Sequence, residues 1–574
     1  MIDKRLHIYL RTLTHIKLCQ FAHFAFRLIF PVVNVAPIDD AIALRRTVGI
    51  IPCVPRTGFA ESQNEFRFLN STKLFDLNRM DWSCREMPKL WRYNLHYFDY
   101  IHEPYRSPQT IPKLITSWID LNPPGVEDAW EPFTVSLRIV NWIKLFLQPE
   151  YHGRVEQGWS QSLYHQALWL EKNIENHLLA NHYFKNGKAL IFAGTFFDGA
   201  DAERWLNKGL EILCSELNEQ ILPDGGHYER SPMYHAMILE DCLDLLNLGL
   251  GSPASVLGAW DSELLDKLKQ TGWSMIQFLL GMSHPDGQIS LFNDAAYGIE
   301  PTPAVLISYF ERLTGEKVAA PYGDYLEFQD SGYFVMSPRA GDRMIIDCGP
   351  VGPEYQPGHS HCDMLSFELS LKGHRVIVDS GCCQYVDGDI RRYNRGNAGH
   401  NTVTVDGENQ SEVWGAHRCA RRARPLYGRL EKLEDGTLLF AGAHDGYRRL
   451  KGKPVHHRTI TWSAETCLIE DRVEGAGSHT LESRLHINPA LSVQVADGCA
   501  VIRGGVELLA TISARAGGRI ETADGWYCPE FGMQQPCTVI TTRFSLTRLP
   551  FLGGWVIKTG NRHAHSVPDP LLPS

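Results

Sequence analysis

Three segments that lie far apart in the chain carry side chains able to bind a metal ion or transfer protons. In the first, GHSHCDMLSFELS (358–370), His359, His361 and Asp363 alternate, so they share one face if the segment is extended. Two imidazoles and a carboxylate on one face form a donor set that suits zinc. Asp379 in VDSG and His400 in AGHNTVTV are further candidate ligands at predicted strand ends. The alternative is that each histidine is an ordinary surface or hydrogen-bonded core residue.

The second segment, ERSPMYHAMILED (229–241), places a tyrosine at the start of a predicted helix. Ser231 is a typical N-cap and Pro232 suits the first helical position, so Tyr234 falls in the first turn. The positive end of the helix dipole favours a phenolate there and predicts a pKa below the usual value of about 10. Such a tyrosine could exchange protons, particularly beside Arg230 or His235. The alternative is a tyrosine that only packs at a helix end.

The third segment, ENHLLANHYFKNGKAL (175–190), repeats an Asn-His pair within a predicted helix. His177, Asn181 and Lys185 lie four residues apart and share a face, with His182 about 100° around the helix. Because Asn and His are mediocre helix formers, their repetition suggests donors for an anionic group. A solvated polar face is the alternative.

Arginines are concentrated between residues 391 and 425. The acidic residues of this segment are Asp406, Glu408 and Glu412, and its arginines are Arg391, Arg392, Arg395, Arg418, Arg421, Arg422 and Arg424. In an acidic chain this predicts a local positive field suited to carboxylate or sulfate groups. The alternative is a solvated charged surface.

The composition argues against several classes of protein. The chain has 574 residues, with 56 Lys and Arg against 66 Asp and Glu, and its net charge of −10 argues against a nucleic-acid binder. Its length predicts two or three domains. No stretch reaches the roughly 18 consecutive apolar residues that a membrane helix needs. The common dinucleotide, P-loop, zincin and α/β-hydrolase motifs are absent from the sequence.

The amino terminus and the cysteines predict the compartment. Lys17 and Arg27 interrupt the stretch in which a signal peptide would be apolar, and no small-residue cleavage site follows. The 14 cysteines include no C-x-x-C pair, which favours free thiols in a reducing compartment. The sequence alone therefore predicts a cytoplasmic protein.

Helical periodicity gives way to strand periodicity near residue 325. We predict an N-terminal helical extension over 1–90, a helical domain over 91–324 and a β domain over 325–574. Apolar residues recur every three or four positions in 136–147, 161–194, 202–222 and 233–250. Short β-branched runs bounded by Gly and Asp predict strands within 366–381, 401–407, 436–442, 457–462 and 467–475. An all-helical half before an all-β half predicts a multidomain α+β protein with separate layers.

Taken in order, these motifs resemble the heparinase II/III-like family of polysaccharide lyases. The segments that carry the resemblance are LWRYNLHYFDYI (90–101), ENHLLANHYFKNGKALIFAG, DGGHYERSPMYH (224–235), GHSHCDMLSFEL, VDSG and HNTV. The resemblance covers about residues 65–560. It implies an incomplete α/α toroid followed by an antiparallel β-sandwich, with the active site in a cleft between the two domains.

The resemblance also implies β-elimination at uronic-acid residues of an acidic polysaccharide. This reaction must stabilise the carboxylate as an enolate, remove the C5 proton and protonate the leaving oxygen at C4. Asn181 and His182 match the Asn/His pair that faces the carboxylate in the family. Tyr234 matches the tyrosine that donates a proton to the leaving group and that could also act as base. His359 matches the catalytic histidine contributed by the β domain.

A metal site is a further implication of the resemblance. His361, Asp379 and His400 match the metal triad of the family. In the relatives that have it, this triad is thought chiefly to brace the cleft. We therefore expect a divalent metal with a structural role, and zinc is the expected ion.

An acidic polysaccharide is the expected partner, and Arg230, Tyr393 and Arg395 are the residues expected to bind it. Family members without a secretion signal resemble proteins that make or trim the capsule or exopolysaccharide of their own cell. This would place the protein in the periplasm or at the cell envelope and makes heparin itself a poor guess for the substrate.

Three alternatives remain open at this stage. Asn176 and His177 could replace the later Asn-His pair, although N-H-Y-x-x-N fits the family spacing better. The same toroid could support a glycoside hydrolase that uses paired carboxylates such as Asp224 and Glu229. The chain could also be a non-catalytic glycan-binding or biosynthetic partner.

Overall fold

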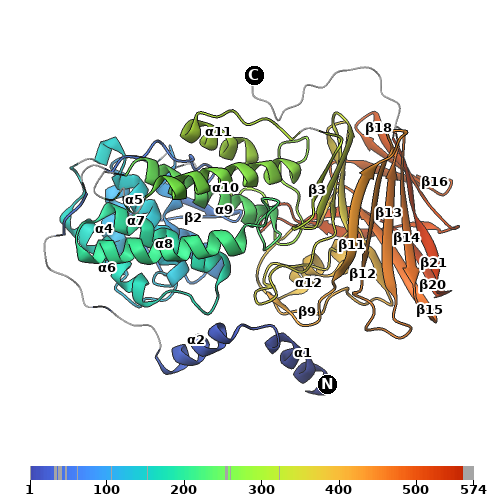
Figure 1. Cartoon of the computed structure of the whole chain (residues 1–574), viewed down its shortest axis with the longest axis horizontal. Helices are drawn as coiled ribbons and strands as arrows, with labels where there is room; N and C mark the ends of the chain where they lie inside the picture. The colour runs from blue at the N-terminus through green and yellow to red at the C-terminus, as the bar shows by residue number, and fades with distance from the viewer. Residues whose placement is uncertain are drawn as a thin grey trace.

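The computed structural model has a helical half and a β half, with an N-terminal pair of helices alongside (Figure 1). It describes residues 2–30, 35, 42–45, 48–60, 62–104, 106–151, 153–252, 256, 258, 260–321, 323–463 and 465–559. The last helix of the helical half ends at Thr314, and the first strand of the β half begins at Tyr325. None of the helices in the described part of the chain has the length and apolar composition needed to span a bilayer.

The helical half is an incomplete α/α toroid, as predicted. Its helices are α3 (Lys89–Tyr97), α4 (Thr110–Leu121), α5 (Pro132–Phe146), α6 (Gln157–Lys172), α7 (Ala180–Phe196), α8 (Ala200–Gln220), α9 (Pro232–Leu250), α10 (Ser262–Gly281) and α11 (Pro303–Thr314). Nearly all side chains of α5 and α9 are buried, so neither helix presents a solvated polar face. A Cβ at Gly194 of α7 would lie 2.5 Å from the backbone nitrogen of Leu206, so glycine allows α7 and α8 to pack closely.

The predicted helical segment 161–194 is two helices in the structure. α6 ends at Lys172 and α7 begins at Ala180, with Leu179 and Ala180 in left-handed conformations (φ 60° and 54°) that interrupt the helix. As a result, Asn181 and His182 lie in the first turn of α7. The first turn of a helix has free amide hydrogens and the positive end of the dipole, so it suits an anionic ligand.

The β half consists of antiparallel sheets, as predicted. Within the described residues, a five-stranded sheet contains β3 (Tyr325–Phe328), β4 (Tyr333–Arg339), β5 (Asp342–Asp347), β6 (Phe367–Leu371) and β7 (His374–Ile377). An eight-stranded sheet has the order β11 (Pro425–Lys432), β12 (Leu438–His444), β13 (Val455–Trp462), β14 (Thr466–Glu474), β21 (Phe551–Thr559), β18 (Glu507–Ala514), β17 (Cys499–Gly504) and β16 (Ser492–Ala496). A four-stranded sheet has the order β19 (Ile520–Tyr527), β20 (Gln535–Arg548), β15 (Ser478–His486) and β8 (Val403–Val405). The smaller elements are α12 (Asp389–Arg395), β9 (Val413–Trp414) and β10 (Arg418–Cys419).

These sheets share an apolar core, which makes the β half a sandwich. Buried Phe334 of β4, Leu369 of β6, Ile460 of β13 and Trp555 of β21 belong to one cluster. Along β13, fully buried residues alternate with partly exposed ones, so one face of the strand meets the core. This alternation is the period-two pattern from which the strands are predicted.

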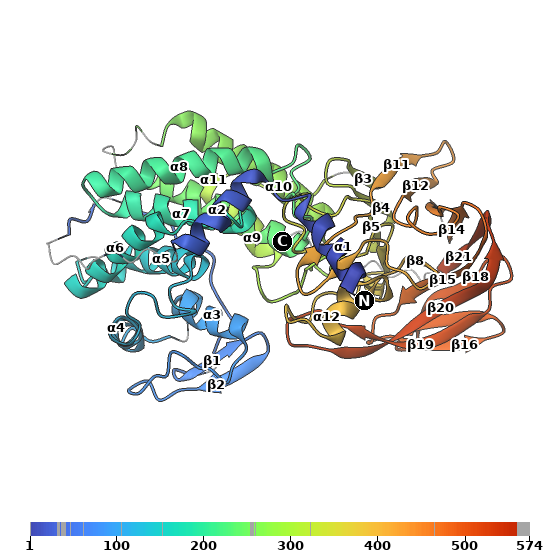
Figure 2. The same ribbon diagram turned by 90° about the horizontal axis from the view of Figure 1, so that it is seen from below.

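Two N-terminal helices bridge the two halves. α1 (Ile2–Leu13) and α2 (Leu18–Ile29) lie along one side of the molecule (Figure 2). On the toroid side, Lys17 pairs with Glu219 at 2.6 Å. On the β side, the indole nitrogen of Trp414 donates a hydrogen bond to Thr12 at 3.1 Å.

The predicted N-terminal extension is only partly helical. β1 (Glu65–Phe68) and β2 (Ser71–Leu74) form an antiparallel hairpin within it. Leu69 and Asn70 adopt left-handed conformations at the turn, with φ of 53° and 58°. Paired left-handed residues are the geometry that a two-residue hairpin turn requires.

Polar contacts fasten the toroid to the β half. In the turn after α8, the Asp224 carboxylate accepts hydrogen bonds from the amide and the hydroxyl of Ser331 at 2.7 and 2.8 Å. The Arg230 guanidinium donates to the backbone oxygen of Ser331 at 3.0 Å. Arg375 of β7 pairs at 2.7 Å with Asp286, which follows α10. The ends of α8, α9 and α10 are therefore fixed against the β half.

Candidate active site

The residues predicted to catalyse lie where two helix ends face a loop of the β half. Asn181 and His182 are in the first turn of α7, and Tyr234 is in the first turn of α9. His359 lies in the loop between β5 and β6. The contacts described next bring Asn181, Tyr234 and His359 together, although they are remote in sequence.

Glu229 links Asn181 to His359. Its carboxylate accepts hydrogen bonds from the side-chain amide of Asn181 at 3.0 and 3.3 Å and from the Asn181 backbone N–H at 3.2 Å. Its oxygen Oε2 lies 3.4 Å from Nε2 of His359. Glu229 is buried, so these three residues form one enclosed polar layer.

Tyr234 completes this layer on the other side of His359. The ring centroids of Tyr234 and His359 are 3.9 Å apart. The hydroxyl of Tyr234 lies 3.0 Å from the hydroxyl of Tyr385. A phenol, an imidazole and an amide therefore adjoin one another at the interface between the helical half and the β half.

The predicted lowering of the Tyr234 pKa is wrong. Ser231 does cap α9, since its hydroxyl accepts a hydrogen bond from the Tyr234 amide at 3.3 Å. Burial, together with the nearby Asp294 carboxylate, nevertheless raises the pKa of Tyr234 well above its usual value. A helix dipole contributes only about 1 kcal/mol, which burial beside an anion outweighs. The phenol is therefore neutral and can donate a proton.

Glu175 favours the charged form of His182. Its Oε1 lies 3.0 Å from Nδ1 of the imidazole, which packs 4.4 Å from the ring of Phe133 and is 33% exposed. Burial opposes the charge, but Glu175 outweighs it and raises the pKa of His182 above its usual value. A cationic imidazole in the first turn of a helix can bind a carboxylate.

The earlier Asn-His pair faces away from this site. The Asn176 side chain donates to the backbone oxygen of Ile174 at 3.4 Å. The His177 ring stacks on His23 of α2, with centroids 5.3 Å apart. The alternative in which this pair replaces Asn181 and His182 is therefore not favoured.

One buried carboxylate, Asp294, orients two histidines of the β half. Asp294 lies in the loop between α10 and α11, with Oδ2 3.0 Å from Nδ1 of His359 and Oδ1 2.8 Å from Nε2 of His361. Arg391 of α12 donates to both oxygens. Burial opposes the charge of Asp294, but Arg391 outweighs it and holds the pKa of this carboxyl well below its usual range. Asp294 is therefore an anion that accepts hydrogen bonds from both imidazoles.

A buried group of candidate metal ligands consists of His361, Asp363 and His400. Their ligand atoms all lie within 4.8 Å of one another. Nδ1 of His361 and Nε2 of His400 have no hydrogen-bond partner among the described residues, which fits an ion bound by both nitrogens. The predicted triad is corrected in one position, because Asp379 lies outside this group. Its carboxylate instead accepts a hydrogen bond from Nδ1 of His400 at 2.7 Å and orients the ring.

The residues predicted to bind substrate make contacts inside the protein instead. Arg230 donates to backbone carbonyls on both sides of the domain joint. Arg395 is buried and donates to backbone carbonyls, including that of Ser360 in the loop of the candidate site. The hydroxyl of Tyr393 lies 2.9 Å from Nε2 of His486. In the structure, Arg230 and Arg395 bond to the backbone and Tyr393 contacts the ring of His486, where the sequence predicts contact with substrate.

Four of the seven arginines in the predicted positive field of residues 391–425 pair with acidic residues of the protein. Arg391 is buried against Asp294. Among the exposed arginines, Arg392 pairs with Asp387 at 3.0 Å and Arg424 pairs with Glu354 at 3.1 Å. The expectation that this segment binds an acidic substrate is therefore not supported.

The carboxylate pair considered for a glycoside hydrolase is not assembled. Both oxygens of Asp224 accept hydrogen bonds from Ser331 at the domain joint. Glu229 instead faces Asn181 and His359. Each carboxylate is thus committed to a different set of protein donors.

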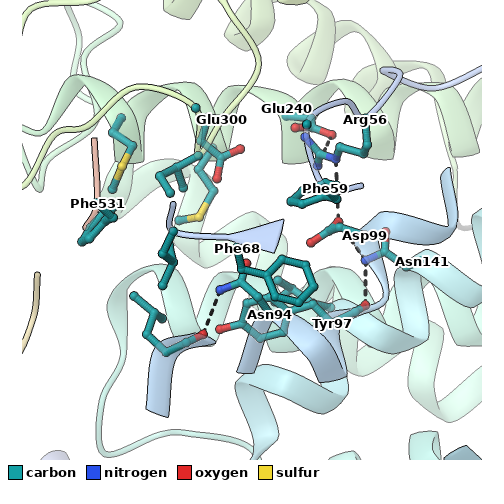
Figure 3. Close-up of a pocket in the computed structure, with 18 of the residues that line it drawn as sticks. Arg56, Phe59, Phe68, Asn94, Tyr97, Asp99, Asn141, Glu240, Glu300 and Phe531 are labelled. Carbon is teal, nitrogen blue, oxygen red and sulfur yellow. Dashed lines mark hydrogen bonds and ion pairs between the residues drawn. The ribbon is translucent and has the colours of Figure 1, made fainter. Parts of the chain in front are cut away.

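One of the catalytic candidates, Tyr234, lines a cavity of about 380 Å³. Figure 3 shows other residues that line this cavity. Its lining includes β1 and the segment before it, α3, α5, α7 and α9, the loop after α10, the segment between β7 and α12 and the loop between β19 and β20. Tyr234, Tyr385 and Phe133 line it, and Phe133 also contacts His182. Pockets at domain joints are common sites for small ligands.

Sequence reasoning missed Asp294 and Tyr385 and misread Arg391. Asp294 lies in FNDAAYG and Tyr385 in CCQYVDG, and neither segment has a spacing that separates it from an ordinary loop. Arg391 is visible in the sequence only as part of a charge run. For Asp294, the one signal in the sequence is that an Asn-Asp pair directly follows the mainly apolar segment ISLF.

We expect Asp294→Asn to lower the free energy of unfolding by about 3–5 kcal/mol, because breaking a buried ion pair leaves Arg391 unpaired. Urea unfolding followed by tryptophan fluorescence measures this change. The control is Asp387→Asn, which removes an exposed partner of Arg392 and should leave stability unchanged within error. Equal effects of the two substitutions would contradict the role of Asp294.

The sequence matches two families that together cover most of the chain. Residues 64–311 match the heparinase II/III N-terminus, and residues 321–561 match the heparinase II/III-like C-terminal family. The heparin-sulfate lyase of Bacteroides stercoris is 28% identical over 322 residues, which cover 50% of this chain and 45% of that protein. The heparin-sulfate lyase of Pedobacter heparinus is 27% identical over 327 residues, covering 51% and 47%. The chain thus spans about half the length of the curated relatives it matches.

Solved structures share the fold. A crystal structure of heparinase III superposes with a TM-score of 0.65 at 18% identity and covers 84% of this chain and 80% of that one. The heparan sulfate lyase structure from Pedobacter heparinus has a TM-score of 0.55 at 18% identity, with coverage of 87% and 82%. With both family matches in the order of the two halves, the chain belongs to the heparinase II/III-like family.

Proposed function

We propose that this protein is a lyase that cleaves a uronic-acid-containing polysaccharide by β-elimination. The observation that carries the proposal is the layer of Asn181, His359 and Tyr234 beside one cavity. It combines a helix end suited to a carboxylate, an oriented imidazole and a neutral phenol. The relatives named as heparin-sulfate lyases support the same chemistry.

The first turn of α7 would bind the uronate carboxylate. His182 supplies positive charge and Asn181 supplies an amide N–H. In the structure this amide donates to Glu229, so a substrate carboxylate would share that donor. Neutralising the carboxylate stabilises the enolate that forms when C5 loses its proton.

His359 and Tyr234 would carry the two proton transfers. Asp294 accepts a hydrogen bond from Nδ1–H of His359, so Nε2 is the atom that takes the C5 proton. The electrons of the C5–H bond form the C4=C5 double bond as the C4–O bond breaks. The neutral hydroxyl of Tyr234 donates its proton to the leaving oxygen. Tyr385 is placed to return a proton to Tyr234 and regains one from solvent, and solvent also removes the proton held by His359.

The substrate class that we propose is an acidic capsule polysaccharide or exopolysaccharide. The internal pairing of arginines around α12 supports this choice. A heavily sulfated chain needs free guanidinium groups, whereas isolated carboxylates need fewer.

We also propose that His361, Asp363 and His400 bind a divalent metal ion, for which zinc is the best match. The ion would cross-link the loop between β5 and β6 to the segment before β8 and so brace the catalytic loop. Asp294 and Asp379 bond the other nitrogens of the two histidines, an arrangement usual for metal-binding imidazoles.

Incubation with a panel of uronate polysaccharides should produce the far-ultraviolet absorbance of a C4=C5 double bond. Tyr234→Phe should lower kcat by roughly 10²–10⁴-fold, because it removes the proton donor. The matched control is Tyr355→Phe, which breaks another tyrosine pair, with Tyr228 at 2.9 Å, and should retain activity. Cleavage of these polymers without the double bond would contradict the proposal.

Glu175→Gln should move the alkaline limb of the kcat/KM profile to lower pH. Glu175 raises the pKa of His182, so the cationic form persists below that pKa and is lost as the pH rises through it. Removing the anion lowers this pKa, which NMR titration of the free protein also reports. Glu171→Gln, which removes a partner of Arg204 instead, should leave the profile in place. An unmoved limb in Glu175→Gln would rule out a cationic His182.

His361→Ala and Asp363→Asn should both lose bound metal, measured per chain by elemental analysis after dialysis. Asp379→Asn should retain the ligands and weaken metal affinity by about 10–100-fold, because it only orients His400. Thermal unfolding should show a lower midpoint in the variants without metal. Full metal content in His361→Ala would exclude this set of ligands.

A further inference from the structure

The cavity beside Tyr234 has features that the elimination chemistry does not use. Its volume of about 380 Å³ lies within the range of roughly 300–1,000 Å³ that is typical of pockets for small ligands. Tyr234 and Tyr385 line it together with residues of α5, α7 and α9. A sugar bound at the catalytic layer would therefore place the next ring of its chain in this cavity.

Buried ion pairs close the inner end of the cavity. The side-chain nitrogens of Lys144 and Lys188 each lie 2.5 Å from a carboxylate oxygen of Asp244. The side chain of Lys144 is 7% exposed, that of Lys188 is 5% exposed and that of Asp244 is fully buried. Arg56 pairs with Glu240 at 2.9 Å (Figure 3). These buried, ion-paired side chains line the cavity, so it ends against the protein interior where they lie.

Aromatic rings from both halves enclose the sides of the cavity. Phe59 precedes β1, Phe68 ends β1 and Tyr97 ends α3 (Figure 3). Phe531 reaches the cavity from the loop between β19 and β20, so the β half also contributes to its wall. Flat apolar rings suit the C–H faces of a sugar ring.

The cations deep in the cavity are already neutralised. In addition to the pairs above, Lys185 lies 2.8 Å from Asp241. Arg67 also lines the cavity and has no acidic partner among the described residues. It is exposed to solvent, however, and donates a hydrogen bond to the side chain of Asn70 at 3.3 Å. A sulfate group that entered the cavity would meet neutralised cations, and burying an unpaired charge is costly.

Glu300 lines the cavity without a hydrogen-bond or ion-pair partner in the described part of the chain (Figure 3). Burial, followed by the nearby Glu240, raises the pKa of Glu300 to about 8. A carboxyl that is mostly protonated at neutral pH can both donate to and accept from a sugar hydroxyl. It provides no attraction for an anion.

We propose that this cavity is a closed subsite for a neutral, hydroxyl-rich terminal sugar without sulfate, so that the enzyme removes units from chain ends. The proposal rests on the lyase function proposed above. It assigns the inner wall of the toroid a role in selecting both the position of cleavage and the substituents of the substrate.

Time courses on an unsulfated uronate polysaccharide test the position of cleavage. Double-bond absorbance counts the bonds cleaved, and size-exclusion chromatography measures the length of the remaining polymer. We expect unsaturated oligosaccharides of one size from the start, while the polymer shortens slowly. A rapid fall in polymer length at the same absorbance would overturn the closed subsite and leave the lyase function intact. Cleavage without absorbance would overturn both.

Glu300→Arg tests the selection against sulfate, because it adds an unpaired cation to the cavity. The ratio of kcat/KM for oligosaccharides with a sulfated or an unsulfated terminal sugar should rise about tenfold or more, equivalent to about 1.4 kcal/mol. Glu300→Gln keeps the hydrogen-bonding groups and should retain activity on the unsulfated substrate. The control Glu434→Arg makes the same charge change in the exposed turn between β11 and β12. An equal ratio in Glu300→Arg and Glu434→Arg would overturn the proposal.

Discussion

The buried ion pair between Asp294 and Arg391 holds the two halves of the candidate active site in register. Asp294 belongs to the helical half, whereas Arg391, His359 and His361 belong to the β half. An enclosed carboxylate needs hydrogen-bond donors, so each of these side chains is fixed by the same anion. Asn293 forms a second contact between the two halves, since its side-chain oxygen accepts a hydrogen bond from the backbone N–H of His361 at 2.9 Å. The imidazole of His359 is thereby tied to the toroid, although its loop belongs to the sandwich.

Nearby carboxylates favour the protonated forms of His182 and Tyr234, which we propose have different roles in the reaction. Glu175 raises the pKa of His182, and burial beside Asp294 raises the pKa of Tyr234. Both side chains therefore hold their protons, which makes the imidazole a cation and the phenol a neutral acid. These are the forms that binding a carboxylate and protonating a leaving oxygen require. The backbone break before α7 adds a helix end to the same space.

Features that depend on local sequence patterns can be predicted from the sequence, whereas those that depend on distant partners or on tertiary burial cannot. Periodicity located the change from helices to strands, and the Ser-Pro pair located the helix start that carries Tyr234. The prediction for the pKa of Tyr234 is wrong because burial, together with Asp294 about sixty residues further along the chain, raises it. Likewise, no spacing shows that Asp363 faces the free nitrogens of the two histidines while Asp379 lies behind one of them. Arg395 resembles a surface cation in the sequence, yet it is buried among backbone carbonyls.

The central claim is that the C–O bond breaks by elimination, without addition of water. It is tested most directly by cleaving a uronate polysaccharide in water enriched in heavy oxygen. The new reducing ends are trapped by reduction before their oxygen exchanges, and mass spectrometry then examines both products. Elimination predicts no heavy oxygen at either new end and one unsaturated product for each bond broken. Incorporation of one heavy oxygen per bond would show hydrolysis and contradict the account.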